Sequence, residues 1–278
     1  VIFFGDSHNF LEDLDRANDL LRRCIVSDGD IRQSAEEHNS RIVLALDLVE
    51  ADLDILFQNS LHAIQSLAPY LCAVKLNRHL ILPLGLTPKI SQLIQAAHQV
   101  GLPVIMDCKV NDIGNTNRVI TQHYMQAGFD ALTANPFVGW TDGLEPVFSV
   151  MKGKGRGVIL LVYMSHKGTT EGYGQQVLDE LTNNTRFQYE IFAEKARDWK
   201  ADGVVVGATY PEKIAEVHRI LGDDIPIFTP GIGTQGGRIA AAAHAGAQYF
   251  IIGRSILYSQ DPIHQVQEFQ QTINKYMG

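Results

Sequence analysis

Eight short apolar runs with helix-like segments between them constrain the fold of this chain more than any other feature. Each run is almost continuously apolar, which is typical of parallel strands covered on both faces. The runs are Ile42–Leu46, Cys72–Leu76, Pro103–Met106, Ala131–Ala134, Val158–Val162, Gly203–Val206, Ile225–Phe228 and Tyr249–Ile252. Intervening segments with helical apolar spacing include Ile90–Val100, Phe187–Trp199, Pro211–Leu221 and Gly237–Ala245. Eight βα repeats over roughly 240 residues predict an α/β fold with a single (β/α)8 TIM barrel, and not an open doubly wound sheet.

The barrel domain is expected to span residues 41–278, because no interdomain linker interrupts the repeats. Residues 1–40 form an N-terminal extension that carries no recognisable chemistry. Apolar residues at helical spacing in it predict a helix that closes the bottom of the barrel or packs outside it; they are Leu11, Leu14, Leu20 and Leu21. The segment Ser27–Ser40 is polar and is expected to be rich in turns.

Composition excludes several classes of protein. The chain has 278 residues, of which 45% are hydrophobic, enough for a sizeable core, and no apolar run is long enough for a membrane helix. Its first residues lack the pattern of a signal peptide, and a net charge of −8 disfavours a nucleic-acid partner. The three cysteines, Cys24, Cys72 and Cys108, lack metal-ligand spacing and suit a reducing compartment. We therefore expect a cytoplasmic protein.

Charged residues end several of the apolar strands. Asp47 ends the first, Lys75 ends the second, and Asp107 with Lys109 ends the third. Asp107 and Lys109 are two residues apart, so they should project from the same face, and Asp112 follows within one turn. A lone Asp-x-Lys pair would favour a structural ion pair. Because barrels of this kind build their active sites at the carboxyl ends of the strands, the repeated occurrence favours a site. Cys108 should point to the opposite face and serve packing.

Two glycine-containing loops follow the last two strands. The segment from Pro230 to Gly237 contains a formal G-x-G-x-x-G, which could indicate dinucleotide binding. The next strand, however, ends in Gly253-Arg254 and lacks the acidic residue that would hold a ribose. The two loops together predict a phosphate site, with backbone N–H groups and the Arg254 guanidinium as donors. The alternative is a pair of tight turns with a surface arginine.

From Arg41 to Pro262 the sequence resembles the orotidine 5′-monophosphate decarboxylase family. The third strand and its exit match the family pattern D-x-K-x-x-D-I-x-x-T at Asp107, Lys109, Asp112, Ile113 and Thr116. Further matches are Asp47, Val74-Lys75, Met164-Ser165-His166, Pro230-Gly231-Ile232-Gly233 with Gln235, and Gly253-Arg254-Ser255.

The resemblance implies decarboxylation of orotidine 5′-monophosphate to uridine 5′-monophosphate in de novo pyrimidine biosynthesis. It implies no cofactor and no metal, with electrostatic stabilisation of a C6 carbanion that Lys109 protonates. The catalytic residues would be Lys109, Asp107, Asp112 and Lys75. The substrate-binding residues would be Asp47, Ile113, Thr116, Ser165, Pro230, Gly231, Gln235, Gly253 and Arg254. Asp112 and Thr116 would come from the neighbouring subunit of a homodimer with shared active sites.

Two departures and two rivals accompany the resemblance. Leu257 replaces a tyrosine that some members place after the phosphate arginine, and Tyr258 comes next, so no tyrosine–phosphate bond is assigned. The segment Lys167-Gly168-Thr169-Thr170 replaces a His-Pro-Gly sequence that some members have.

The enzyme rival is a metal-dependent sugar-phosphate aldolase or decarboxylase. Enzymes of that kind bind magnesium through a glutamate at the end of the second strand, where this chain has Lys75, and an ammonium cannot ligate a cation. The other rival is a non-catalytic phosphate-ligand-binding barrel.

Overall fold

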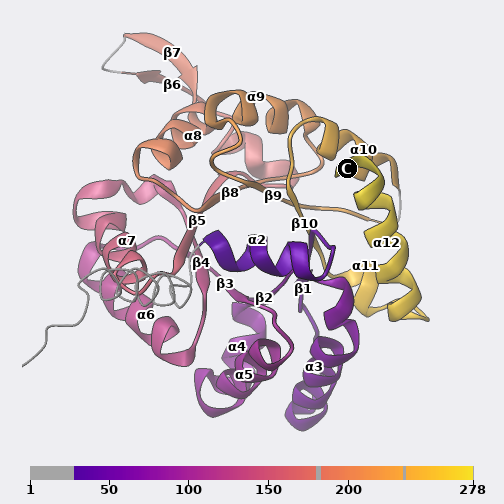
Figure 1. Cartoon of the computed structure of the whole chain (residues 1–278). Helices are drawn as coiled ribbons and strands as arrows, with labels where there is room; N and C mark the ends of the chain where they lie inside the picture. Colours follow the sequence, from indigo (N-terminus) through magenta and orange to yellow (C-terminus); the bar gives the residue numbers. More distant parts are fainter. Residues whose placement is uncertain (1–27, 180–182, 234–235, 278) are drawn as a thin grey trace, which may run out of the picture.

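A closed barrel of eight parallel strands forms the centre of the described chain. The computed structural model describes residues 28–179, 183–233 and 236–277. The strands follow the order β1-β10-β9-β8-β5-β4-β3-β2 around the barrel, which confirms the predicted fold (Figure 1). Their bounds are β1 Ile42–Ala45, β2 Ala73–Asn77, β3 Val104–Val110, β4 Ala131–Ala134, β5 Gly157–Tyr163, β8 Gly203–Val206, β9 Ile227–Pro230 and β10 Tyr249–Ile252.

The helices form a ring outside the strands (Figure 1). They are α3 Leu53–Leu67, α4 Arg78–Leu84, α5 Ser91–Gln99, α6 Gly114–Ala127, α7 Glu145–Lys152, α8 Gln188–Asp198, α9 Pro211–Leu221, α10 Gly236–His244, α11 Arg254–Leu257 and α12 Pro262–Met277. Shorter 3-10 or π-helical segments are Ala68–Tyr70, Gly85–Ile90, Pro136–Val138, Trp140–Leu144 and Lys167–Glu171. None of the helices in the described ranges is long and apolar enough to span a membrane.

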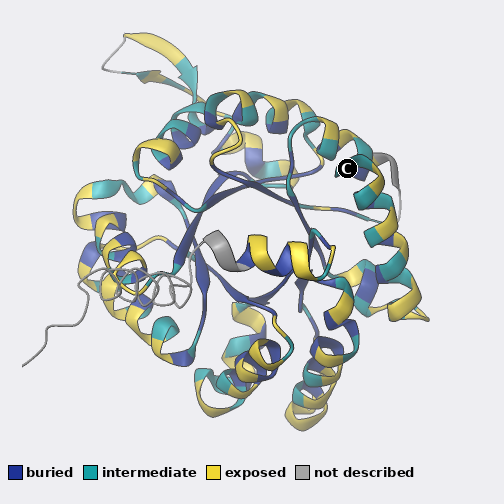
Figure 2. Cartoon of the chain, viewed as in Figure 1, coloured by how far each residue is buried: buried dark blue, intermediate teal, exposed yellow. Residues whose placement is uncertain are grey.

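Burial explains the pattern of the sequence. The barrel strands are buried almost throughout, whereas the helices expose their outer faces (Figure 2). Helix α9 begins at Pro211 and buries Ile214, Val217 and Leu221, a stripe at helical spacing. Every residue of β1 is buried, as expected for a strand between the barrel interior and the helices.

The described part of the N-terminal extension holds a helix at a different place from the predicted one. Helix α2, Asp28–Glu37, occupies most of the segment Ser27–Ser40, so the expectation of a turn-rich stretch is wrong. Ile31 and Ala35 are one helical turn apart and both are buried in the barrel core, which stabilises the helix despite its polar composition. The leucines on which a helix was predicted, from Leu11 to Leu21, lie outside the described residues.

A hairpin inserted between β5 and α8 was also missed. Strands β6, Gln176–Asp179, and β7, Asn184–Phe187, pair antiparallel and project from the barrel (Figure 1). Arg186 on β7 binds Glu194 on α8 at 2.7 Å and Asp179 at 3.1 Å, which ties the hairpin to the barrel.

Candidate active site

A cavity of about 780 Å³ opens at the carboxyl ends of the barrel strands. Every one of the eight barrel strands, or the loop directly after it, contributes to its lining. Nine residues predicted from the sequence line it: Asp47, Lys75, Asp107, Lys109, Ser165, Pro230, Gly231, Gly253 and Arg254. The structure thus brings these nine residues together at one cavity.

Asp107 is the centre of a chain of alternating charges in this cavity. Lys75 Nζ donates to Asp107 Oδ2 at 2.8 Å, and Lys109 Nζ donates to Asp107 Oδ1 at 2.5 Å. Lys75 also lies 3.9 Å from Oδ1 of Asp47. Lys75 and Asp107 are buried, 6% and 8% exposed, so the charges persist only because each is paired.

The two lysines determine the protonation of Asp107. Burial would raise the pKa of its carboxyl, but the positive charges and hydrogen bonds of Lys75 and Lys109 outweigh it and lower the pKa to about 2. Asp107 is therefore an anion at neutral pH. Its two oxygens are each occupied by an ammonium group, which fixes both lysine side chains in place.

Asp47 offers an acceptor to a ligand. Its Oδ1 atom is buried and accepts no hydrogen bond from the described residues. Burying an acceptor oxygen costs free energy unless it receives a hydrogen bond. A hydroxyl of a ligand in the cavity would donate the hydrogen bond that the described residues do not provide.

Cys108 lies between the two charged residues but belongs to the opposite face. It is buried, and its thiol donates to the carbonyl of Thr133 at 3.3 Å. Burial raises the pKa of this thiol to about 12, so it stays protonated and inert at neutral pH. The prediction that Cys108 serves packing is confirmed.

The opposite side of the cavity combines glycines with arginines. Gly231 has φ +93°, a conformation that favours glycine, and a Cβ atom on Gly253 would lie 2.8 Å from the backbone oxygen of Ala45. Arg254 begins α11 and lines the cavity with Arg238 of α10, whose guanidinium donates to the oxygen of Gly231 at 3.4 Å. Gln235 lies outside the described residues. The two exposed arginines make this side of the cavity suited to an anion.

Three predicted residues do not line the cavity of their own chain as the described residues define it: Asp112, Ile113 and Thr116. Asp112 is exposed, and its carboxylate accepts from the backbone N–H of Ile113 at 2.7 Å. The buried side chain of Asn117 brackets the Asp112 backbone, because it accepts from the Asp112 N–H at 3.1 Å and donates to its carbonyl at 2.5 Å. Asn117 therefore fixes the backbone of this loop, and Asp112 is not among the residues that line this cavity.

Four further polar residues of the cavity were missed from the sequence: Asn77, Thr133, Thr209 and Arg238. Thr133 is one polar residue in the short apolar run of β4, and Arg238 follows the glycines after β9. Asn77, Thr133 and Thr209 are uncharged, and uncharged polar side chains in strands and loops are common. Arg238 lies in α10 and not at the end of a strand, so the strand-end rule did not select it.

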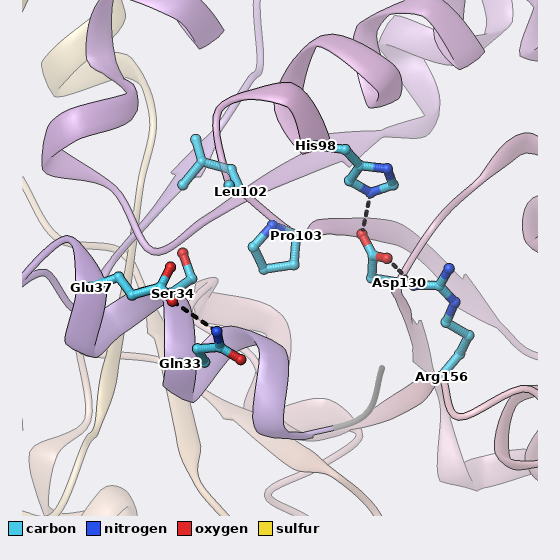
Figure 3. A pocket seen from close by; sticks show the side chains of 9 residues that line it. Gln33, Ser34, Glu37, His98, Leu102, Pro103, Asp130 and Arg156 are labelled. Carbon is cyan, nitrogen blue, oxygen red and sulfur yellow. Dashed lines mark hydrogen bonds and ion pairs between the residues drawn. The ribbon is translucent and has the colours of Figure 1, made fainter. Parts of the chain in front are cut away.

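A second cavity of about 350 Å³ lies at the other end of the barrel, between α2 and the starts of β3, β4 and β5 (Figure 3). Its centre is the buried Asp130, which accepts from His98 Nε2 at 2.8 Å, from the backbone N–H of Val104 at 2.7 Å and from Arg156. Both Asp130 oxygens thus have protein partners. We assign this cluster to the stability of the barrel, as is usual at this end of the fold.

Comparison with known proteins decides the family. Residues 40–269 match the family described as orotidine 5′-phosphate decarboxylase / HUMPS family. This chain belongs to that family. It is 38% identical over 224 residues to the orotidine 5′-phosphate decarboxylase of Thermococcus kodakarensis, covering 80% of this chain and 92% of that one.

Solved structures of orotidine 5′-phosphate decarboxylases share the barrel. That of Pyrococcus horikoshii is 32% identical with a TM-score of 0.68, covering 84% of this chain and 98% of that chain. The UMP synthase of Leishmania donovani is 26% identical with a TM-score of 0.78. This chain is 89% covered in that comparison but spans only 56% of the UMP synthase chain.

Proposed function

We propose that this chain decarboxylates orotidine 5′-monophosphate to uridine 5′-monophosphate and CO2 in pyrimidine biosynthesis. The observation that carries the proposal is the buried array in which Asp107 binds Lys75 and Lys109 at 2.8 and 2.5 Å. An array of this kind presents a cation to a developing negative charge without reorganisation, which is how electrostatic catalysis lowers a barrier. The curated relatives at 32–38% identity carry the same activity in their names.

The chemical step is a heterolysis followed by a proton transfer. The bond between C6 and the carboxylate breaks, CO2 departs, and the electron pair stays on C6 in the plane of the ring, where the π system cannot delocalise it. Lys109 Nζ supplies the positive charge beside that pair and then donates a proton to it, and solvent reprotonates the amine. Asp107 is proposed to lie near the departing carboxylate and to hold Lys109 in position.

The rest of the cavity is proposed to bind the nucleotide. Asp47 and Lys75 would hold the ribose hydroxyls, with the buried Oδ1 of Asp47, which accepts no hydrogen bond from the described residues, as an acceptor. Ser165 would contact the pyrimidine, and the loops at Pro230, Gly231 and Gly253 with Arg254 would bind the phosphate. Gln235 is assigned between the pyrimidine and the phosphate on the resemblance alone. Phosphate binding far from C6 can help to reach the transition state.

A homodimer with shared sites completes the proposal. We assign Asp112, Ile113 and Thr116 to the neighbour's cavity, since none of the three lines the cavity of its own chain in the described structure. Ile113 itself is a large apolar side chain that is 67% exposed. An exposed apolar residue of this kind fits a protein–protein contact, and it supports an interface at the Asp112 loop.

The metal-dependent sugar-phosphate rival fits less well. Lys75 forms ion pairs with both Asp47 and Asp107, so neither carboxylate is available to a metal alone. Lys75 also occupies the position at which that rival needs a carboxylate ligand. In the described residues, no group of three or more histidine, cysteine, aspartate and glutamate side chains is arranged to hold a metal.

Two features suit a cytoplasmic enzyme without a nucleic-acid partner. The thiols of Cys72 and Cys108 are buried and free, and the net charge of the chain is acidic.

Turnover in D2O tests the proposed chemistry. Because Lys109 exchanges its protons with solvent, the uridine 5′-monophosphate formed in D2O should carry one deuterium at C6, visible by NMR and mass spectrometry. Lys109→Ala should form almost no product. Product without deuterium at C6 would contradict protonation from an exchangeable group such as Lys109.

A further inference from the structure

The strand that carries Asp107 and Lys109 does not pair regularly with its neighbour. Met106 on β3 lies opposite Leu132 on β4, and Val110 lies opposite Ala134. Three residues of β3, Asp107–Lys109, therefore face one residue of β4, which is Thr133. A bulge of this kind re-aims side chains and removes backbone groups from the ladder.

Thr133 makes a hydrogen bond to each of the three bulged residues. Its hydroxyl accepts from the backbone N–H of Lys109 at 2.9 Å and donates to Oδ1 of Asp107 at 3.1 Å. Its carbonyl accepts from the thiol of Cys108 at 3.3 Å. Thr133 is 2% exposed, so water cannot replace these partners freely.

Lys109 needs such a partner because of its backbone. Its φ is +50°, in the left-handed region that a side chain with a Cβ atom rarely adopts. Strained residues persist only where their surroundings fix them, and they cluster at functional sites. The bulge leaves the backbone N–H of Lys109 without a partner in the sheet, and the Thr133 hydroxyl accepts a hydrogen bond from it. The same hydroxyl donates to the Asp107 carboxylate, so it links the Lys109 backbone to Asp107.

We propose that Thr133 is a positioning residue of the decarboxylase, whose hydroxyl sets the geometry of Lys109 against Asp107. This inference rests on the proposed function. Thr133 acts through these two residues, so its loss should reduce the rate of the chemical step more than it weakens nucleotide binding. The phosphate side of the cavity, with Arg254, does not involve it.

Thr133→Val and Thr133→Ser form a matched pair. Valine keeps the shape and the β-branch but lacks the hydroxyl, whereas serine keeps the hydroxyl and loses only the methyl group. For Thr133→Val we expect kcat to fall by about 10- to 100-fold, since a hydrogen bond to a charged group and a buried amide partner are lost together. The dissociation constant of uridine 5′-monophosphate should change by no more than about threefold, because remote contacts supply most of its binding. Thr133→Ser should keep most of the wild-type kcat.

The outcomes separate the inference from the proposed function. If wild-type protein does not decarboxylate orotidine 5′-monophosphate, the proposed function fails. If wild-type protein is active but Thr133→Val retains its kcat, or Thr133→Ser loses as much as Thr133→Val, the positioning role is overturned. A parallel loss of kcat, nucleotide affinity and melting temperature would also overturn it, since that pattern indicates a structural role. If Thr133→Val does not fold, Thr133→Ala replaces it in the comparison with Thr133→Ser, and the same outcomes decide.

Discussion

Lys75 on β2 reaches across to the neighbouring strand and donates to Oδ2 of Asp107 at 2.8 Å, with both side chains buried. In the register of the two strands, Asp107 lies opposite Asn77, so Lys75 leans two residues along its strand to make this contact. Asp107 therefore remains ionised in a buried site and holds a second ammonium, that of Lys109, beside the cavity. The catalytic proposal follows from this arrangement of charges.

Replacement of Arg254 tests the proposed phosphate site. Loss of a charge-assisted, forked contact should lower kcat/KM for orotidine 5′-monophosphate by about two or more decades in Arg254→Ala. Orotidine without the phosphate should show little further loss in this variant. Arg219→Ala, on the exposed surface of α9, serves as a control and should leave both substrates unaffected. Equal losses for the two substrates in Arg254→Ala would show that Arg254 does not act on the phosphate.

Mixing of two inactive variants tests the shared site. Lys109→Ala loses the proton donor and Asp112→Ala unbalances the charges, so each should be nearly inactive alone. If Asp112 serves the neighbour's site, a mixed dimer has one site with both changes and one intact site. Random reassociation then restores about a quarter of wild-type activity.

A mixture of Lys109 and Asp107 variants is the matched control for this experiment. Both residues belong to the same chain's cavity, so every site keeps one change and no activity should return. Subunit exchange that mass spectrometry confirms, without recovery in the Lys109→Ala and Asp112→Ala mixture, would exclude a shared site.

The low pKa of Asp107, about 2, predicts a dependence of stability on pH. Its unfolded pKa is about 4, so the group stabilises the fold above that value and loses its contribution as the pH falls toward about 2. Lowering the pH from 5 to 3 should therefore destabilise wild type by roughly 1 kcal/mol relative to Asp107→Asn, measured as the unfolding free energy. Urea denaturation measures it, with Asp224→Asn, at an exposed carboxyl outside the cavity, as control. A difference independent of pH would contradict this account of Asp107.

Asp130 at the other end of the barrel should matter for stability and not for catalysis. Asp130→Asn leaves Arg156 without its buried carboxylate partner and should lower the unfolding free energy by about 2 to 4 kcal/mol, with kcat unchanged. The exposed pair of Arg197 and Asp198 provides the control, and Asp198→Asn should cost less than about 1 kcal/mol. A loss of kcat in folded Asp130→Asn would assign this cavity a role in the reaction.

The barrel was predictable from the sequence because its strands are buried on both faces. The runs Ala131–Ala134, Gly203–Val206 and Tyr249–Ile252 became strands with the predicted bounds. The third strand continues to Val110, four residues beyond its apolar run, because charged residues at the mouth of the cavity can belong to a bulged strand. Helix α2 was missed because its place in the fold depends on only two buried residues, Ile31 and Ala35. The β6–β7 hairpin was missed because it is held by ion pairs of Arg186.

Most charged residues of the site were predictable, whereas Arg238 and the neutral residues of the cavity were not. Asp107 and Lys109 stood out because charge at the end of an apolar strand requires a reason. Thr133 could not be singled out from the sequence, because threonine is common in strands. Its contacts become visible only in the register of β3 against β4. The family resemblance implied that Asp112 serves the neighbouring subunit, and in the structure its backbone is held by Asn117.

Turnover without metal tests the central claim most directly. Purified protein treated with EDTA should convert orotidine 5′-monophosphate to uridine 5′-monophosphate, with loss of substrate absorbance and release of one CO2 per product, at the rate of untreated protein. Lys109→Ala should be inactive under the same conditions. Activity that EDTA abolishes and Mg²⁺ restores, or turnover of a sugar phosphate in place of the nucleotide, would contradict the account.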